Sequence, residues 1–177
     1  MSPIVLDIPV IETERLRLCA PSDEWLDPWA AFWASDRSAY VGGPRSRADT
    51  WRAIAAMLGH WHLRGFGMFA VTDRTSGTFY GQIGPWRPEG WPEREIGWIL
   101  IEAAEGRGIG FEAAVAARAF AYDTLGWDTA VSYVHPDNAR SRALAERLGA
   151  VVDPEAAPPD DDPCLVYRHP VPGGAAA

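Results

Sequence analysis

Residues 95–120 read EIGWILIEAAEGRGIGFEAAVAARAF, and they are the most informative stretch of this chain. The apolar run at residues 95–101 is typical of a central β-strand that is buried on both faces. A glycine-rich segment follows at residues 105–110, and apolar residues then recur at helical spacing through residue 122. A strand, a glycine turn and a helix in this order can form an anion site, because the first N–H groups of a helix have no partner within it.

The three glycines of this turn suit a phosphate ligand. Gly106, Gly108 and Gly110 lack Cβ atoms, so the backbone can approach phosphate oxygens closely. Arg107 adds a guanidinium whose fork matches phosphate geometry. The dinucleotide fingerprint G-x-G-x-x-G fails here whichever glycine begins it, and the Gly-Lys-Ser/Thr of a Walker A loop is absent from the sequence. A passive turn that binds nothing remains the alternative at this point.

Length and charge narrow the class of protein. The 177 residues predict a single domain over residues 1–177, with a core at about 12–169 and a frayed tail at 170–177. The net charge of −8 disfavours nucleic acid and anionic membranes as partners and favours a cationic partner such as an amine or a basic peptide. Charge that serves only solubility is the alternative.

Cysteine and histidine usage points to a reducing compartment without a metal site. Cys19 and Cys164 lie far apart and are expected to be buried free thiols. No stretch is long and apolar enough for a membrane span, and acids stand where a signal peptide would carry positive charge, which favours the cytoplasm. His60 and His62 form an H-x-H pair without a third ligand nearby, so no metal is predicted.

The periodicity along the chain predicts a mixed α/β order. Asn138 is expected to cap the helix at 138–150, with Leu144 and Leu148 facing the core. On the helix at 108–126, apolar residues recur every three or four positions at Phe111, Val115, Ala119 and Tyr122. Strands are predicted at 14–20, 67–74, 79–86, 95–101, 129–135, 150–153 and 164–170, and helices at 23–36, 46–65, 108–126 and 138–150.

Three motifs in order resemble the GNAT superfamily of acetyl-CoA-dependent N-acetyltransferases, and within it the RimJ/RimL-type branch. They are ETERLRLCAPS at 12–22, the loop 105–110 followed by Glu112-Ala113, and Asn138 with Ser141 before Leu148-Gly149. The resemblance covers about residues 12–168. It implies an α/β (α+β) fold with a mixed, largely antiparallel sheet of about six to seven strands, a central splayed parallel pair and about four flanking helices.

The resemblance implies acetyl-CoA as co-substrate, with the loop amides around its pyrophosphate and a strand N–H in segment 98–101 facing the developing oxyanion. Glu105 departs from the family pattern, which has Arg or Gln there, so we expect Glu105 to face solvent and Arg107 to offset part of its charge. The residues expected to bind the coenzyme are Trp98, Ile99, Leu100, Ile101, Gly106, Arg107, Gly108, Ile109, Gly110, Phe111 and Asn138.

A general base must deprotonate the attacking amine, because an alkylammonium has a pKa of about 10.4. Glu95 opens the central strand where several family members carry the base; a solvated carboxylate paired with Arg94 or Arg87 is the alternative. His135 ends the next strand and has a suitable intrinsic pKa, with a turn histidine before Pro136 as the alternative.

The leaving thiolate is often protonated by a tyrosine in this family, but Ala145 occupies that position here. In the RimJ/RimL branch a serine takes this role, and Ser141 matches it; a hydroxyl that merely caps the helix is the alternative. Asn138 is expected to hold the coenzyme or the strand–helix junction.

Tryptophans are the candidates for the acceptor pocket, since an aromatic pocket attracts an amine by cation–π interaction. Trp86 and Trp91 lie in a Pro/Gly-rich loop, and Trp33 lies on a helical stripe where a core role is the alternative. The expected reaction is acetyl transfer to a primary amine, either a peptide N-terminus or a small amine. An acetyl-CoA-binding sensor without efficient turnover is the alternative, and the resemblance leaves room for a homodimer.

Overall fold

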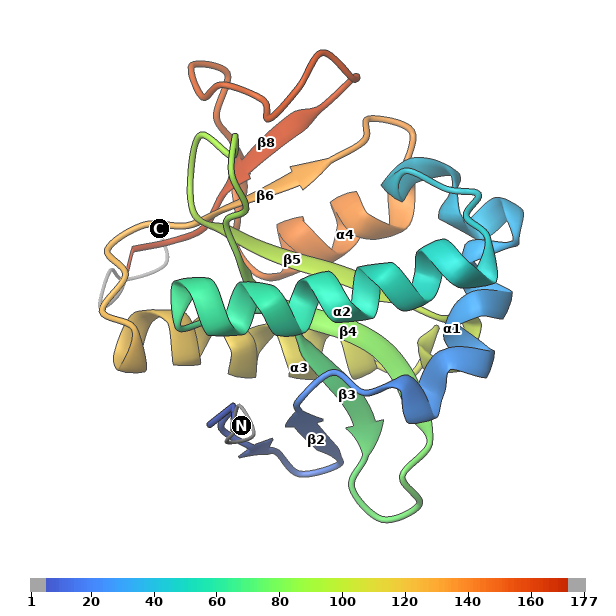
Figure 1. Ribbon diagram of the computed structural model, residues 1–177. Helices are drawn as coiled ribbons and strands as arrows, with labels where there is room; N and C mark the ends of the chain where they lie inside the picture. Colours follow the sequence, from blue (N-terminus) through green and yellow to red (C-terminus); the bar gives the residue numbers. More distant parts are fainter. Residues whose placement is uncertain (1–5, 172–177) are drawn as a thin grey trace.

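The central sheet organises the chain in the computed structural model, which describes residues 6–171 (Figure 1). The sheet has eight strands in the order β1-β2-β3-β4-β5-β6-β8-β7, and only β5 and β6 pair in parallel. The strands are β1 (Ile11–Glu12), β2 (Leu16–Cys19), β3 (Phe69–Asp73), β4 (Phe79–Trp86), β5 (Glu95–Leu100), β6 (Val131–Val134), β7 (Val151–Val152) and β8 (Leu165–Arg168). The predicted mixed sheet is confirmed, and the two-residue β1 is the strand that the sequence patterns missed.

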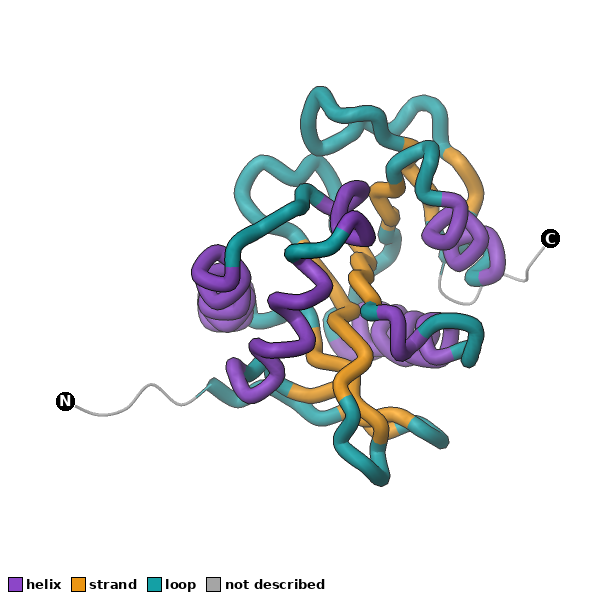
Figure 2. The backbone as a smooth tube through the Cα atoms, turned by 90° about the vertical axis from the view of Figure 1, so that its right-hand side faces the viewer, coloured by secondary structure: helices purple, strands orange, loops and turns teal. Residues whose placement is uncertain are grey.

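Helices cover both faces of this sheet. Helices α1 (Leu26–Trp33) and α2 (Arg47–Arg64) lie on one face, and α3 (Ile109–Ala119) and α4 (Ala139–Arg147) lie on the other. Figure 2, turned by 90°, shows the strands between the two helical layers. Short helical turns η1 (Asp23–Trp25), η2 (Asp36–Val41), η3 (Glu102–Ala104) and η4 (Phe120–Thr124) complete the elements.

Helix α3 packs against the sheet through small residues. Ile109, Ala113, Ala114 and Ala117 are buried, whereas Val115 is 40% exposed. Alanines let the helix backbone approach the sheet closely, and the larger Phe111 and Tyr122 pack only at its flanks.

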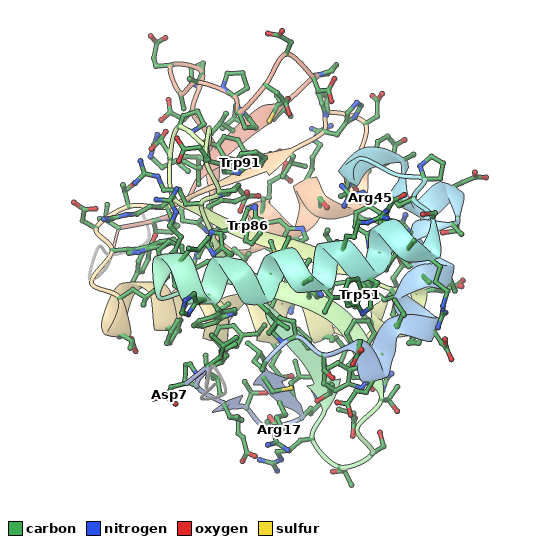
Figure 3. The ribbon with its side chains drawn as sticks, viewed as in Figure 1. Asp7, Arg17, Arg45, Trp51, Trp86 and Trp91 are labelled. Atoms are coloured by element: carbon green, nitrogen blue, oxygen red, sulfur yellow. The ribbon has the colours of Figure 1, made fainter. Side chains whose placement is uncertain are left out.

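The tryptophans of the first two helices divide between core and surface. Trp29 and Trp33 are almost fully buried with Phe32 against the sheet. Trp51, labelled in Figure 3, is 50% exposed. Helix α2 instead buries Thr50, Ile54, Met57, His60 and Trp61.

The parallel pair β5–β6 separates almost at once. Its register holds only at Glu95 and Val131, and the carbonyl of Ile96 is met by a side chain of β6. The Ser132 hydroxyl donates to that carbonyl at 2.6 Å and also contacts His169 Nε2 at 2.9 Å. Burial, helped by the nearby Arg118 charge, lowers the pKa of His169 to about 3. His169 is therefore neutral near pH 7, and its contact with Ser132 holds the hydroxyl that bonds Ile96 where the two strands separate, as predicted.

Three other expectations concern the chain as a whole. Within residues 6–171 no helix combines the length and apolarity that crossing a bilayer requires. Cys19 and Cys164 are free thiols, as expected, although both are half-buried rather than buried. The tail predicted at 170–177 lies mostly outside the described residues, which end at 171.

Candidate active site

Two adjoining cavities lie along β5 where it separates from β6. The loop cavity, of about 360 Å³, lies between the segment 104–111, α4 and η2. The aromatic cavity, of about 680 Å³, lies between the α1–α2 connection, the ends of β4 and β6, and the segment 159–164. Residues that line both cavities are Val41, Trp98, Ile99, Asn138 and Ser141. The splay therefore joins the glycine loop to the tryptophan-rich side of the fold.

The glycine loop forms one wall of the loop cavity. Gly106 and Gly108 have φ values of 67° and 74°, a left-handed conformation that residues with a Cβ rarely adopt. Gly108 is the N-cap of α3, and a Cβ on Gly110 would lie 2.7 Å from Leu100 Cδ1. The glycines thus turn the chain sharply and seat the start of α3 against β5. The positive end of the α3 dipole then lies at this cavity.

The charges around the loop differ from the expected arrangement. The Arg107 side chain turns to the Ala103 carbonyl, at 3.1 Å, and lies 5.1 Å from the Tyr80 ring centroid. Glu105 is exposed as expected, but its carboxylate pairs with Arg37 and, at 2.6 Å, with Arg140. Two arginines from η2 and α4 therefore balance the Glu105 charge in place of Arg107.

Three arginines at the loop cavity were missed at the level of sequence. Arg37, Arg140 and Arg147 line it, and the Arg147 guanidinium lies 4.1 Å from the Phe111 ring centroid. Arg140 and Arg147 are seven residues apart and share a helix face with Leu144. This spacing could have identified two of the three.

The expected coenzyme residues fall into two groups. Ile109 is buried in the core and Ile101 packs into the cluster around Trp29. The side chain of Arg107 also lies outside the cavity lining. The expected residues that do line the loop cavity are Trp98, Ile99, Leu100, Gly106, Gly108, Gly110, Phe111 and Asn138.

The peptide groups of β5 add polar atoms to the splay. Arg94 and Ile96 direct their carbonyls toward β6, and Ile101 directs its N–H toward β4. Since successive peptide groups alternate along a strand, the N–H groups of Trp98 and Leu100 face the splay. Trp98 lines both cavities and Leu100 lines the loop cavity, so these N–H groups are donors beside the glycine loop.

Glu95 is a buried carboxyl at the edge of the aromatic cavity. It is 9% exposed, and the Trp91 indole N–H donates to it at 2.7 Å. Burial raises the pKa of Glu95 to about 7, against the opposing hydrogen bonds from Trp91 and the Tyr133 backbone. Arg94, the partner considered above, pairs with Asp128 instead. Glu95 is therefore not a solvated strand-end charge.

Ser141 and Trp98 meet at the junction of the cavities. The Trp98 indole N–H donates to Ser141 Oγ at 3.2 Å. Asn138 Oδ1 accepts from the Ser141 backbone N–H at 3.2 Å, which confirms Asn138 as the cap of α4. Because the Ser141 hydroxyl accepts from Trp98, its own proton is available to another group. Ala145, in the position of the family tyrosine, is fully buried.

His135 lines the aromatic cavity but supports a turn. Its Nδ1 accepts from the Asp137 backbone N–H at 3.1 Å, and its ring lies 4.9 Å from that of Tyr40. His60 is structural, since Nδ1 lies 2.7 Å from the Phe66 carbonyl oxygen. No group of three metal-ligating side chains occurs among residues 6–171.

All three candidate acceptor tryptophans line the aromatic cavity. Trp86 stacks on His60 with ring centroids 4.2 Å apart, and Trp91 holds Glu95. Trp33 is nearly fully buried, with the Arg45 guanidinium 4.1 Å from its ring centroid. Figure 3 labels Trp86, Trp91 and Arg45 around this region.

Comparison with known proteins gives one family. A family model described as an acetyltransferase (GNAT) domain matches residues 15–151. An acetyltransferase from Agrobacterium tumefaciens is 41% identical, with a TM-score of 0.86 over 96% of this chain and 98% of that chain. A GnaT-family acetyltransferase from Bordetella pertussis is 28% identical, with a TM-score of 0.75 over 92% of this chain and 99% of the other.

One more distant structure shares the fold. It is the RimL ribosomal L7/L12 alpha-N-protein acetyltransferase in complex with coenzyme A. Its identity is 17% and its TM-score 0.73, over 92% of this chain and 98% of that chain.

Proposed function

The chain belongs to the GNAT acetyltransferase family, and on that premise we propose that it transfers acetyl from acetyl-CoA directly to a primary amine, either a small amine or a peptide N-terminus. One observation carries the proposal: a buried carboxyl with a pKa of about 7, Glu95, lies in a cavity that adjoins the glycine-loop cavity at Trp98 and Ser141. The proposed base, Glu95, therefore lies beside the proposed site of acetyl-CoA.

The loop cavity suits the pyrophosphate of coenzyme A. The amides at the start of α3 are donors that the helix leaves unpaired, and Gly108 brings that backbone to the cavity wall. Arg37 and Arg140 add positive charge beyond what Glu105 cancels, since two guanidiniums face one carboxylate. These features support binding of the pyrophosphate, which carries two negative charges. The Trp98 and Leu100 N–H groups would face the thioester side.

Glu95 is the proposed general base. A carboxyl with a pKa near 7 is about half ionised at neutral pH and is a stronger base than an exposed glutamate. It would take a proton from the ammonium, and the free amine would then attack the carbonyl carbon of the thioester. Such proton transfer typically contributes about 10²–10⁴-fold to the rate. His135 is the less favoured base, because its Nδ1 serves the turn.

Ser141 is the proposed donor to the leaving group. As the C–N bond forms and the C–S bond breaks, the leaving thiolate takes the hydroxyl proton of Ser141. The serine is then reprotonated by the proton that the attacking nitrogen loses on becoming an amide. The hydrogen bond from Trp98 to Ser141 Oγ supports this role, since it leaves the hydroxyl proton free. A thiol with a pKa of roughly 8.5 needs only modest help to leave.

The acceptor is the least constrained part of the proposed reaction. RimL is an alpha-N-protein acetyltransferase of ribosomal L7/L12, and it supports a peptide amine for this chain only through a shared fold. Trp33, Trp86 and Trp91 would line the acceptor site. We further propose one acetyltransferase unit over residues 1–177 in the cytoplasm, with room for a homodimer and without nucleic acid, membrane or metal partners.

Amine-dependent thiol release tests the proposal. The purified chain with acetyl-CoA should release coenzyme A thiol faster when a panel of small amines and short peptides is added, and the acetylated amine should be detected by mass. Glu105 and Ala145 favour the alternative of a coenzyme-binding sensor, since both depart from the family pattern. Tight coenzyme binding with no amine in the panel accelerating release would support that alternative instead.

A further inference from the structure

Arg45 occupies a fixed position in the aromatic cavity. It lies between η2 and α2, and its backbone N–H donates to the Trp33 carbonyl at 2.9 Å. Its guanidinium lies 4.1 Å from the Trp33 ring centroid, and Nε donates to the Gly42 carbonyl at 3.3 Å. The stacking and this hydrogen bond hold the planar group in one orientation.

The outer half of this guanidinium lacks a protein partner. Among residues 6–171, no hydrogen bond or ion pair uses Nη1 or Nη2 of Arg45. The neighbouring cations differ, because Arg47 pairs with Asp27 and Arg37 pairs with Glu105. In a chain with a net charge of −8, a half-buried arginine without a carboxylate partner is a position that suits an anionic ligand.

The two ends of the aromatic cavity carry complementary groups. Of the described residues that line it, Arg45 is the only arginine. Glu95 is its buried acid, and two further acids, Asp160 and Asp162, are exposed. In Figure 3, Arg45 lies toward the α1–α2 connection, and Trp91, which holds Glu95, lies toward the other end of the region. Aromatic side chains of Trp33, Trp86 and Trp91 line the space between. An amine near Glu95 could therefore have an anionic group near Arg45.

We propose that the acetyl acceptor is a small amine whose carboxylate is separated from the amine by an apolar chain, as in an ω-amino acid, and that Arg45 binds this carboxylate through Nη1 and Nη2. The inference rests on the proposed acetyl transfer to an amine and narrows its acceptor class. An α-amino acid carries both groups on one carbon, which is too short to join the two ends of the cavity, so the proposal favours the longer acid.

Matched acceptors and variants test the assignment. Straight-chain ω-amino acids of increasing length are each compared with their carboxamides in the thiol-release assay, and the wild type should prefer the acids. Arg45→Gln should lower kcat/KM for the acids by roughly 10- to 100-fold, the range expected on losing hydrogen bonds to a charged group, and leave the carboxamides unchanged. Arg47→Gln is the control, because Arg47 is two residues away and its guanidinium is an exposed partner of Asp27.

Arg45→Lys keeps the charge and loses the fork, so it should recover only part of the preference. Equal use of acids and carboxamides by the wild type, or an acid preference that survives in Arg45→Gln, would overturn the assignment. If no amine supports thiol release, the proposed function fails and binding decides this inference. Thermal shifts with coenzyme A present should then show stabilisation by the acids alone, lost in Arg45→Gln; equal shifts with acids and carboxamides would refute it.

Discussion

Arg15 and Glu112, which lie 97 residues apart, join the start of β2 to the first turn of α3 through an ion pair of 2.7 Å. Glu112 also accepts from Thr13 Oγ1 at 2.5 Å, and Arg15 Nη1 donates to the Arg107 carbonyl at 2.8 Å. Burial acts to raise the pKa of Glu112, but these hydrogen bonds outweigh it and hold the pKa below its usual value. Contacts from Thr13 and Arg15, near the N-terminus, therefore hold the glycine loop in place, and we call them the clamp.

Loss of this clamp should weaken coenzyme binding. Glu112→Gln keeps the size of the side chain but removes the charge that Arg15 faces, so the loop amides should lose their fixed position. We expect a higher Kd for coenzyme A by calorimetry and a stability loss of about 1–3 kcal/mol. Glu89→Gln is the control, since Glu89 is a fully exposed ion-pair partner of Arg64. An unchanged Kd in Glu112→Gln would show that the loop holds its shape without the clamp.

The left-handed Gly108 should be essential to the loop. Gly108→Val forces a β-branched residue into φ 74°, which costs about 1–2 kcal/mol and displaces the first amides of α3. Gly77→Val is the matched control, because Gly77 has φ 73° and lies in the β3–β4 turn, with nothing near its missing Cβ. Both variants should lose similar stability, but only Gly108→Val should lose coenzyme affinity. Equal affinity in the two would contradict the assignment of the loop.

The pH dependence of kcat/KM should report Glu95. The base acts when ionised, so the rate should rise as the pH passes through about 7 and then level, apart from the titration of the amine itself. Glu95→Gln should lower kcat/KM and remove this rise, the acid limb of the pH profile. Trp91→Phe deletes the indole N–H that favours the ionised carboxylate, so the limb should move to higher pH.

Trp86→Phe is the control for that shift, because Trp86 stacks on His60 and is not a donor to Glu95 among the described contacts. A wild-type limb near 7 that persists in Glu95→Gln would assign the base to another group, with His135 next in line.

Ser141→Ala should lower kcat and leave coenzyme binding nearly intact. The variant removes the hydroxyl proton proposed for the leaving thiolate, and we expect a loss of about 10²-fold, the low end of the range for general acid catalysis. Trp98→Phe removes the donor to Ser141 but keeps the hydroxyl, so its loss of kcat should be smaller. Full activity of Ser141→Ala in steady-state assays would exclude the serine from the reaction.

His169 should make stability sensitive to acid. Its pKa is about 3 in the folded chain and about 6.5 in an unfolded one, so only the unfolded chain binds the proton between these values. The free energy of unfolding should therefore fall as the pH drops from 6.5 toward 3, by up to about 1.4 kcal/mol per pH unit from this group. His169→Gln should reduce this slope in denaturant titrations, and the exposed His62→Gln should not. Identical slopes in all three proteins would show that other groups govern acid stability.

Local patterns were sufficient for the framework of this protein. The strand, the glycine turn and the helix at residues 95–120 follow from an apolar run, from backbone freedom at Gly108 and from helical spacing, all of which act between near neighbours. The cap at Asn138 is equally local, because its side chain bonds the N–H three residues on. These features also sufficed to indicate the family.

Only the packed structure decided the electrostatics of the site. Glu105 gains its partners Arg37 and Arg140 from residues 68 and 35 positions away, which no local pattern pairs. The pKa of Glu95 is raised to about 7 because the folded chain buries it, and a carboxyl at a strand end looks the same in sequence whether it is covered or not. Desolvation and charge pairing depend on which distant segments meet, whereas secondary structure depends on neighbours along the chain.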